Sequence, residues 1–433
     1  MVPPEIIAII MGFLFSDIDD DMASLKACAL VSRTFRAISQ RLIFSTIKFQ
    51  AQESRFDFEQ LLDANPSIAN YVRSLAYVTY LPNPRQYVNY PPRSCNARAG
   101  ALFHCLRGVT SFTFGSIVKA QRNDWVLLTS SLESPLSSFF QSNNIMKLSL
   151  KNIANLPITF FSYFPNLTGL KINNVSVVDS PLSDGFCKPN SLVSPTAGPL
   201  KLFSLCVEQA KYTDHLGAIA KLLDPATGPL MDSGGLEELN VDVRYIGPGS
   251  PRNPLASSTM GMDVIEGLLR SSTALKSLTF SGDPQDLSFL QNMADLNPGS
   301  MKTLKTLKLC YRLGREDGDP YPHFTKGLQQ ISGENCLEAI SLNISIPAYT
   351  RCTTDSSQWS QLDRVLSEQG GFPFLRRVRL EIIIGVIGLG YTRNEFRSLL
   401  EDIGEHHFSR LRNNYQVDFR FDTRFNMDAV ISN

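Results

Sequence analysis

The residues best able to do chemistry in this sequence do not fall into a catalytic arrangement. His406 and His407 are neighbours in a helical stretch, where adjacent side chains point in different directions. His104 and Cys105 are also adjacent, rather than spaced to meet across a site. The sequence holds no G-x-S-x-G elbow, no Walker loop and no H-E-x-x-H motif. It therefore predicts a protein that binds and does not catalyse, and that needs no cofactor.

Glycines and cysteines give no ligand site either. Gly385-x-x-Gly388-x-Gly390 follows an apolar run, but its spacing is the reverse of the dinucleotide-binding fingerprint, so it indicates a strand end and a turn. The 8 cysteines are scattered and include no C-x-x-C pair. Neither a zinc site nor a disulfide framework is predicted, and we expect reduced, mostly buried thiols.

A different set of residues has the spacing for binding a partner. An L-x-x-L-x-L-like motif recurs ten times, first at Val72 and last at Leu375. In a strand, its apolar residues point to one side and the residues between them to the other. The outward residues that we single out as candidates for target binding are Lys171, Asn240, Asp242, Lys308, Asn343, Arg379 and Glu381. Their charges are mixed, so they predict no ligand sign. Solvated residues without a dedicated role remain the alternative.

The elements that would position these residues are short strands separated by helices. Amphipathic helical stretches lie between several of the motifs, at 215–223, 263–270, 324–331 and 361–366. Strand, crossover, strand is the way a leucine-rich repeat builds a parallel sheet. We therefore predict an α/β fold for residues 51–433: an irregular leucine-rich-repeat solenoid with strands on the concave face and helices on the convex face. Residues 81–98 and 312–323 are expected to form inserted loops, which are either binding surfaces or surface loops without a binding role.

The amino-terminal residues predict a helix that is apolar on every side. Prolines at the entry and Glu5 in the first turn favour a helix start. A helix of this kind must bury every side. Two further helices are expected, one around Leu25 and one that starts after Ser32 as its N-cap. Two such short helices can cover only part of the first, so we expect the rest of its apolar surface to be covered by a partner protein.

This segment resembles an F-box. The resemblance is carried by Pro3-x-Glu5-Ile6-Ile7, then Ile10 and Leu14, then Leu25-x-x-Cys28-Ala29-Leu30-Val31-Ser32-Arg33-x-Phe35-Arg36. Residues 41–47 fit as well, and 61–75 are similar to the segment that follows the F-box in many fungal members. Val2 departs from the family, which usually has Leu there.

The resemblance implies that residues 1–50 form an F-box that docks to the Skp-type adaptor of a Skp–cullin–F-box ubiquitin ligase. The implied adaptor contacts are Pro3, Ile6, Ile7, Ile10, Leu14, Leu30 and Val31. The chain would then be the non-catalytic subunit that holds an unknown target protein, while its ligase partner supplies the transfer chemistry. The alternative is that these helices only cap the first repeat of an interaction scaffold.

Charge and hydropathy exclude other partners. Lys and Arg together number 41, as do Asp and Glu, so nothing in the net charge favours nucleic acid or an anionic membrane. Residues 1–15 lack the basic start of an export signal and are too short to span a bilayer. We expect a cytoplasmic or nuclear location.

Overall fold

The computed structural model describes residues 3–14, 20–49, 52–79, 100–116, 123–129, 132–179, 199–208, 216–223, 231–242, 258–282, 293, 296–312, 321–347, 356–385, 401 and 403–426. The predicted α/β class is confirmed, since parallel strands alternate with helices along the chain. The chain divides into two compact units, Met1–Leu200 and Lys201–Asn433, each of which is described by itself. The loop predicted at 81–98 lies outside the described residues, as does most of the one at 312–323.

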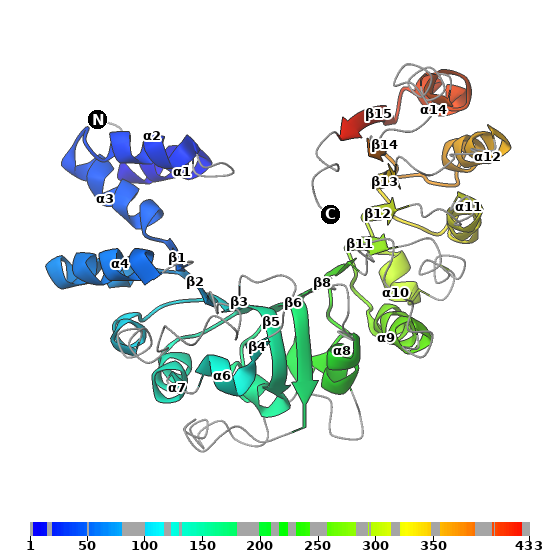
Figure 1. The fold of residues 1–433 in the computed structure, drawn as a ribbon. Coiled ribbons are helices and arrows are strands. Elements are labelled where there is room, and N and C mark those ends of the chain that lie inside the picture. The colour runs from blue at the N-terminus through cyan, green and yellow to red at the C-terminus, as the bar shows by residue number, and fades with distance from the viewer. Residues whose placement is uncertain are drawn as a thin grey trace. The chain divides into compact units, whose positions relative to one another are not determined.

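Unit 1 begins with helices and continues as a parallel sheet (Figure 1). Its helices are α1 (Pro4–Leu14), α2 (Asp20–Cys28), α3 (Arg33–Ile43), α4 (Gln52–Ala64), α6 (Trp125–Thr129) and α7 (Glu133–Ser142), with short 3₁₀ helices at Pro66–Tyr71 and Ile158–Tyr163. Its strands are β1 (Thr46–Phe49), β2 (Ser74–Thr79), β3 (Ser111–Ser116), β4 (Asn123–Asp124), β5 (Lys147–Pro157) and β6 (Gly169–Val178). They pair in the order β1-β2-β3-β5-β6, and β4 pairs with β5. Every pairing is parallel.

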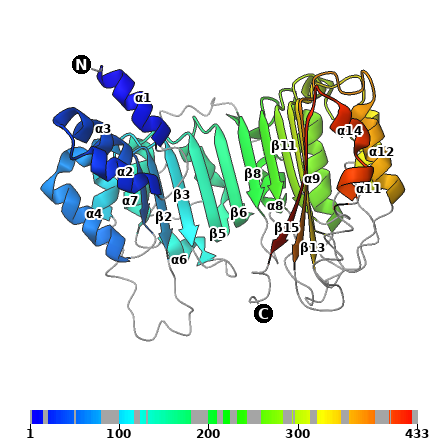
Figure 2. The same cartoon turned by 90° about the horizontal axis from the view of Figure 1, so that it is seen from above.

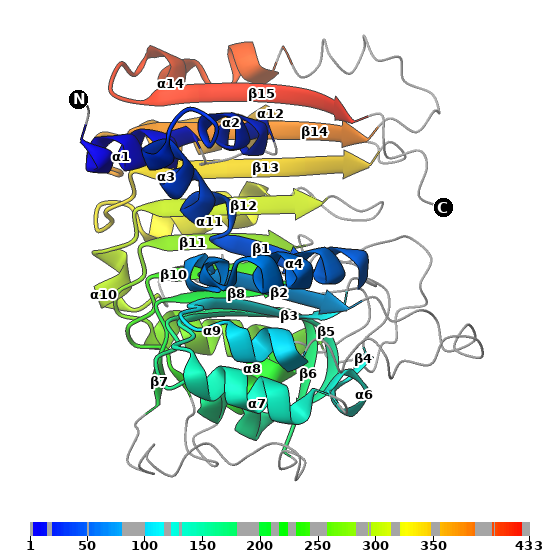
Figure 3. The ribbon, with the colours of Figure 1, turned by 90° about the vertical axis from the view of Figure 1, so that its left-hand side faces the viewer.

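Unit 2 repeats one pattern, in which a strand is followed by a helix on the same side of the sheet (Figure 2). Its main strands are β8 (Ser204–Glu208), β10 (Glu238–Asp242), β11 (Ser277–Gly282), β12 (Thr306–Arg312), β13 (Ala339–Pro347), β14 (Arg377–Gly385) and β15 (Asp418–Asn426). Its helices are α8 (Leu216–Leu223), α9 (Ser258–Ser271), α10 (Pro298–Met301), α11 (Tyr321–Gln330), α12 (Ser356–Ser367) and α14 (Ser409–Asn413). The short strands β7 (Leu200–Lys201) and β9 (Met231–Asp232) form a separate pair. The main strands pair in chain order, all parallel, as Figure 3 shows for β11 to β15.

The repeated apolar motif predicts the strands correctly. Each of its ten occurrences coincides with a strand, from β2 to β14. Its thirty apolar residues are all buried, including Leu304, Leu307 and Leu309 around β12. Equivalent residues are direct neighbours across the sheet, so that Leu307 pairs with Leu278 and with Ile340. Stacking of these rows against the helices forms the core of each unit.

The ten motifs do not include β1 and β15, nor the two-residue strands β4, β7 and β9. β1 carries the same motif as Phe44-x-x-Ile47-x-Phe49, since Ile47 pairs with Leu75 and Phe49 with Tyr77. It was overlooked because these residues follow directly on the N-terminal helices. β15 pairs with β14 through Phe419 and Phe421, but Gln416 stands where the motif requires an apolar residue. The predicted boundary at residue 50 remains a prediction, although β1 already belongs to the sheet of unit 1.

Buried asparagines shape β5 and β6. Asn152 and Asn174 have φ values of 54° and 56°, a left-handed conformation that Asn tolerates better than most residues. The Asn174 amide donates to Asn152 Oδ1 at 2.7 Å, and the Asn152 amide donates to the Ser116 carbonyl at 2.7 Å. Both side chains are buried, so these bonds replace the water that they lost on folding.

Candidate functional site

The first candidate surface lies on the N-terminal helices. Ile7 and Met11 of α1 pack with Leu25 of α2, and side chains of α3 such as Phe35 and Ile38 close this small core. Ser32 caps α3 as predicted, because its hydroxyl accepts from the Phe35 N–H at 3.3 Å. Ile7 is only 8% exposed, so its side chain stabilises these helices from within.

Other apolar residues, on α1 and in the turn between α2 and α3, remain exposed to water. We call them the N-terminal apolar surface, and their exposed fractions are 46% for Ile6, 56% for Ile9, 54% for Ile10, 81% for Leu30 and 68% for Val31. Ile6, Ile9 and Ile10 are spaced i, i+3 and i+4 and therefore share one face of α1. Burying a side chain of this size contributes about 1.5–3 kcal/mol. A partner that covered these side chains would therefore gain binding free energy from the burial of their apolar surface.

The predicted adaptor contacts therefore differ in the exposure of their side chains. Ile6, Ile10, Leu30 and Val31 belong to the N-terminal apolar surface, and Pro3 is exposed. Leu14 ends α1, but its side chain lies outside the described residues. Ile9 was not among the predicted contacts, although its spacing from Ile6 would have indicated it.

The second candidate surface is the face of the unit 2 sheet opposite the helices. Along each strand from β8 to β14, apolar side chains buried toward the helices alternate with partly or fully exposed residues, which are almost all polar. We call this the open sheet face. Six of the seven predicted target-binding residues lie on it: Asn240, Asp242, Lys308, Asn343, Arg379 and Glu381. The seventh, Lys171, lies on β6 of unit 1, opposite Ser149 of β5.

The strand register groups the residues of the open sheet face. Asn343 of β13 pairs directly with Glu381 of β14, while Lys308 and Arg379 both pair with Ser341 and so flank it. The Ser341 hydroxyl donates to Asn343 Oδ1 at 3.3 Å. Glu381 Oε1 is 2.8 Å from Nε of Arg424 on β15. The face therefore offers hydrogen-bond donors, acceptors and charges, but hardly any apolar surface.

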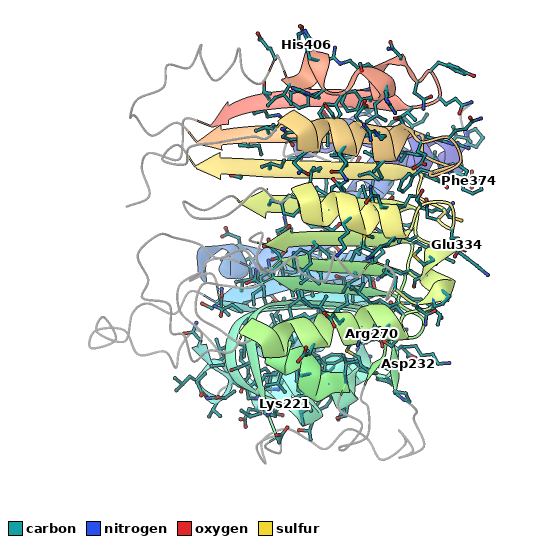
Figure 4. All side chains as sticks on the ribbon, turned by 90° about the vertical axis from the view of Figure 1, so that its right-hand side faces the viewer. Lys221, Asp232, Arg270, Glu334, Phe374 and His406 are labelled. Atoms are coloured by element: carbon teal, nitrogen blue, oxygen red, sulfur yellow. The ribbon has the colours of Figure 1, made fainter. Side chains whose placement is uncertain are left out.

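A third group of residues lies at the edge where the strands of unit 2 begin. Glu237 pairs with Lys276 at 2.8 Å and Lys305 with Glu338 at 2.9 Å, both between consecutive repeats. The hydrogen bond from Lys305 lowers the pKa of Glu338, and burial has only a smaller, opposing effect. Figure 4, which looks at the helices of unit 2, places Phe374 and Glu334 at this edge. Exposed ion pairs of this kind contribute little to stability.

One buried carboxylate joins two helices in unit 2. Asp363 of α12 is 3% exposed and accepts from the backbone N–H groups of Arg410 at 3.1 Å and Leu411 at 2.9 Å. It thereby caps the first turn of α14. Burial raises the pKa of Asp363, and the two backbone hydrogen bonds only partly offset this effect.

His104 and His407 do not assemble a triad with this carboxylate. His407 Nδ1 lies 3.1 Å from the Ser360 hydroxyl of α12, while both Asp363 oxygens are used by backbone N–H groups. His104 Nδ1 lies 3.5 Å from the Ser138 hydroxyl, and both of these residues are exposed or partly exposed. A nucleophile–base–acid chain of the hydrolase type requires the acid to orient the histidine. The geometry of these residues fits hydrogen bonding between neighbouring helices.

No protein-family model matches the sequence, and no curated protein matches it significantly. Within the described ranges there is no group of three or more potential metal ligands. The described part of the chain also contains no helix with the length and apolar character needed to cross a membrane. Five described cysteines form no disulfide, but the expected burial is not found: Cys105 is exposed, and Cys28, Cys206, Cys310 and Cys336 are partly exposed.

Proposed function

We propose that the protein is the substrate-recognition subunit of a Skp–cullin–F-box ubiquitin ligase. The N-terminal helices would be an F-box that docks to the Skp-type adaptor, and the strand–helix repeats a degenerate leucine-rich-repeat solenoid that holds a target protein. The target would be ubiquitinated because it is held near the ligase, at a high effective concentration.

The observation that carries the proposal is the N-terminal apolar surface. Five large apolar side chains, three on α1 and two in the turn between α2 and α3, remain between 46% and 81% exposed, although the core of these helices is closed by Ile7, Met11 and Leu25. A small domain gains nothing by leaving such residues in water, and an exposed apolar face such as that of Ile6, Ile9 and Ile10 on α1 often marks an interaction site. Four of these side chains are at positions for which the F-box resemblance implies adaptor contact.

The open sheet face supports the second half of the proposal. Seven strands at a spacing of about 4.8 Å give a face on the order of 30 Å across, which is sufficient for a protein interface. Its polar character suits a partner that is recognised by hydrogen bonds and charge rather than by apolar burial.

The alternative is an interaction scaffold whose N-terminal helices only cap the sheet. One group of contacts favours it. Arg41 of α3 lies over the Tyr71 ring at 5.9 Å, and the Ser45 carbonyl, just after α3, accepts from the N–H groups of Arg73 and Ser74 at 2.8 and 2.9 Å. The helices thus join the first repeat closely, as a cap must. A cap does not, however, require Ile6, Ile9 and Ile10 to be exposed.

Co-purification of the full chain with a Skp-type adaptor separates the two functions. We expect a complex with the wild-type protein and its loss in Ile10→Glu, because a carboxylate cannot enter an apolar interface unpaired. The matched control is Leu127→Glu on α6, which is 70% exposed and lies outside the N-terminal helices. Adaptor binding that is absent from the wild type, or equally strong in both variants, would refute the ligase function.

A further inference from the structure

We propose that the open sheet face binds an acidic segment of a partner polypeptide, with Lys308 and Arg379 each contacting one carboxylate. The inference rests on the proposed function of this face as the target-binding surface and defines the chemistry of the partner. It begins from one row of residues in direct register across five strands: Thr279, Lys308, Ser341, Arg379 and Arg420.

The first observation is a pair of like charges. Arg379 of β14 and Arg420 of β15 are directly opposite each other, and both are exposed. Like charges at directly paired positions destabilise a sheet. Asp418 offsets part of the Arg420 charge. An anion bound at Arg379 would reduce the repulsion that remains, and the planar Arg fork matches a carboxylate in a bidentate arrangement.

The second observation is the distribution of ion pairs. Arg420 pairs with Asp418 of its own strand at 3.3 Å, and Arg424 pairs with Glu381 at 2.8 Å. Among the described residues, no carboxylate forms an ion pair with Lys308 or Arg379. Lys308 and Arg379 are both exposed, and Ser341, which lies between them in the row, has a much smaller side chain than either.

The balance of charge favours carboxylates over more highly charged groups. The exposed or partly exposed residues of β12 to β15 on this face include five cations (Lys308, Arg377, Arg379, Arg420 and Arg424) and three anions (Glu381, Asp418 and Asp422). A phosphate dianion at Arg379 would also meet Glu381 and Asp422 in the neighbouring row, at a cost in repulsion.

The spacing of the two cations indicates how the acids are separated. Lys308 and Arg379 are two strands apart, about 9.6 Å at a strand spacing of 4.8 Å. One turn of a polyproline II helix spans three residues and about 9.3 Å, with residues i and i+3 on the same side. An extended segment with acids at i and i+3 therefore fits the pair.

The test is a titration of the full chain with fluorescent peptides, followed by anisotropy. The probe carries two Glu residues at i and i+3 in a proline-rich segment. The comparison peptides carry the same residues at i and i+2, Gln in place of Glu, or phosphoserine in place of Glu. We expect the i, i+3 Glu peptide to bind most tightly and its affinity to fall as salt is raised.

The protein variants locate the site. The double substitution Lys308→Glu and Arg379→Glu should weaken binding at least about 100-fold, since a hydrogen bond to a charged group is worth roughly tenfold or more in affinity. The control Lys326→Glu makes the same charge change on the exposed side of α11 and should leave binding unchanged.

Three results would overturn the inference: no binding of the Glu peptide, binding that is equal in the double variant, or binding of the phosphoserine peptide alone. Competition by a single-stranded oligonucleotide at the same residues, with no binding of the Glu peptide, would also overturn it. The double variant should still co-purify with the adaptor. Its adaptor binding therefore separates failure of this inference from failure of the proposed function.

Discussion

The N-terminal helices and the strands of unit 2 differ in how completely they bury their apolar side chains. In unit 2, each strand from β8 to β14 buries its motif residues completely and leaves a polar face to water. In the N-terminal helices, α1 buries Ile7 and Met11 but leaves Ile6, Ile9 and Ile10 at about half exposure. The strands of unit 2 therefore leave hardly any apolar surface exposed, whereas α1 leaves one apolar face exposed, which the proposed adaptor would cover.

This difference indicates two modes of binding. Burial of the N-terminal apolar surface would be driven mainly by the hydrophobic effect and would depend little on salt. Binding on the open sheet face would depend on hydrogen bonds and charges, and therefore on ionic strength. A protein that links a constant partner to a particular target has a use for both modes.

The largest effect is expected from an apolar substitution inside unit 2. Leu309→Ala removes a side chain that is 0% exposed from the centre of the sheet and should lower the free energy of unfolding by about 2–5 kcal/mol. The matched substitution Ile9→Ala in the N-terminal apolar surface should change it by less than about 0.5 kcal/mol. Chemical denaturation of both variants measures the two values. Similar losses would mean that the Ile9 side chain is covered in the isolated protein, and the comparison would fail.

A smaller effect is expected from the polar link inside unit 2. Asp363→Ala leaves the N–H groups of Arg410 and Leu411 without their acceptor and should cost about 1–3 kcal/mol. Asp363→Asn retains an acceptor and should cost less.

The same residue gives a pH dependence with a defined sign. Because burial raises the pKa of Asp363 in the folded state, the folded protein binds this proton more tightly than the unfolded chain does. The contribution of this group to stability is therefore greatest at low pH and declines as the pH rises from the ordinary aspartate value through the raised one. The difference in unfolding free energy between the wild type and Asp363→Asn, measured across that range, should show this decline. A difference that grows in favour of the wild type as the pH rises would contradict it.

Most strands of the sheet can be predicted from the sequence. The alternation of buried and exposed side chains along a strand depends only on the residues of that strand. The ten motifs locate ten strands, and the motif geometry places Lys308 and Arg379 on the open face correctly. β15 was missed because a terminal strand needs fewer buried residues, which allows Gln416 at a motif position. The pairing of Arg379 with Arg420 could not be predicted, since it depends on that strand.

The N-terminal helices were less completely predictable. That α1 is apolar on all sides follows from its residues, but which side faces the small core does not. The contacts with Leu25 select Ile7 and Met11 for the interior and leave Ile9 outside. The resemblance to an F-box implies adaptor contact for both Ile7 and Ile10. In the structure Ile7 is buried in the small core, whereas Ile10 is exposed.

Hydrogen exchange with and without a Skp-type adaptor tests the central claim most directly. Amide exchange reports local opening, and a docked partner slows it in the segments that it covers. We expect slower amide exchange in α1 and at residues 28–31 on addition of the adaptor, and unchanged exchange in β8 to β15. Unchanged exchange in α1 at saturating adaptor would contradict the claim that its exposed apolar face is a docking surface.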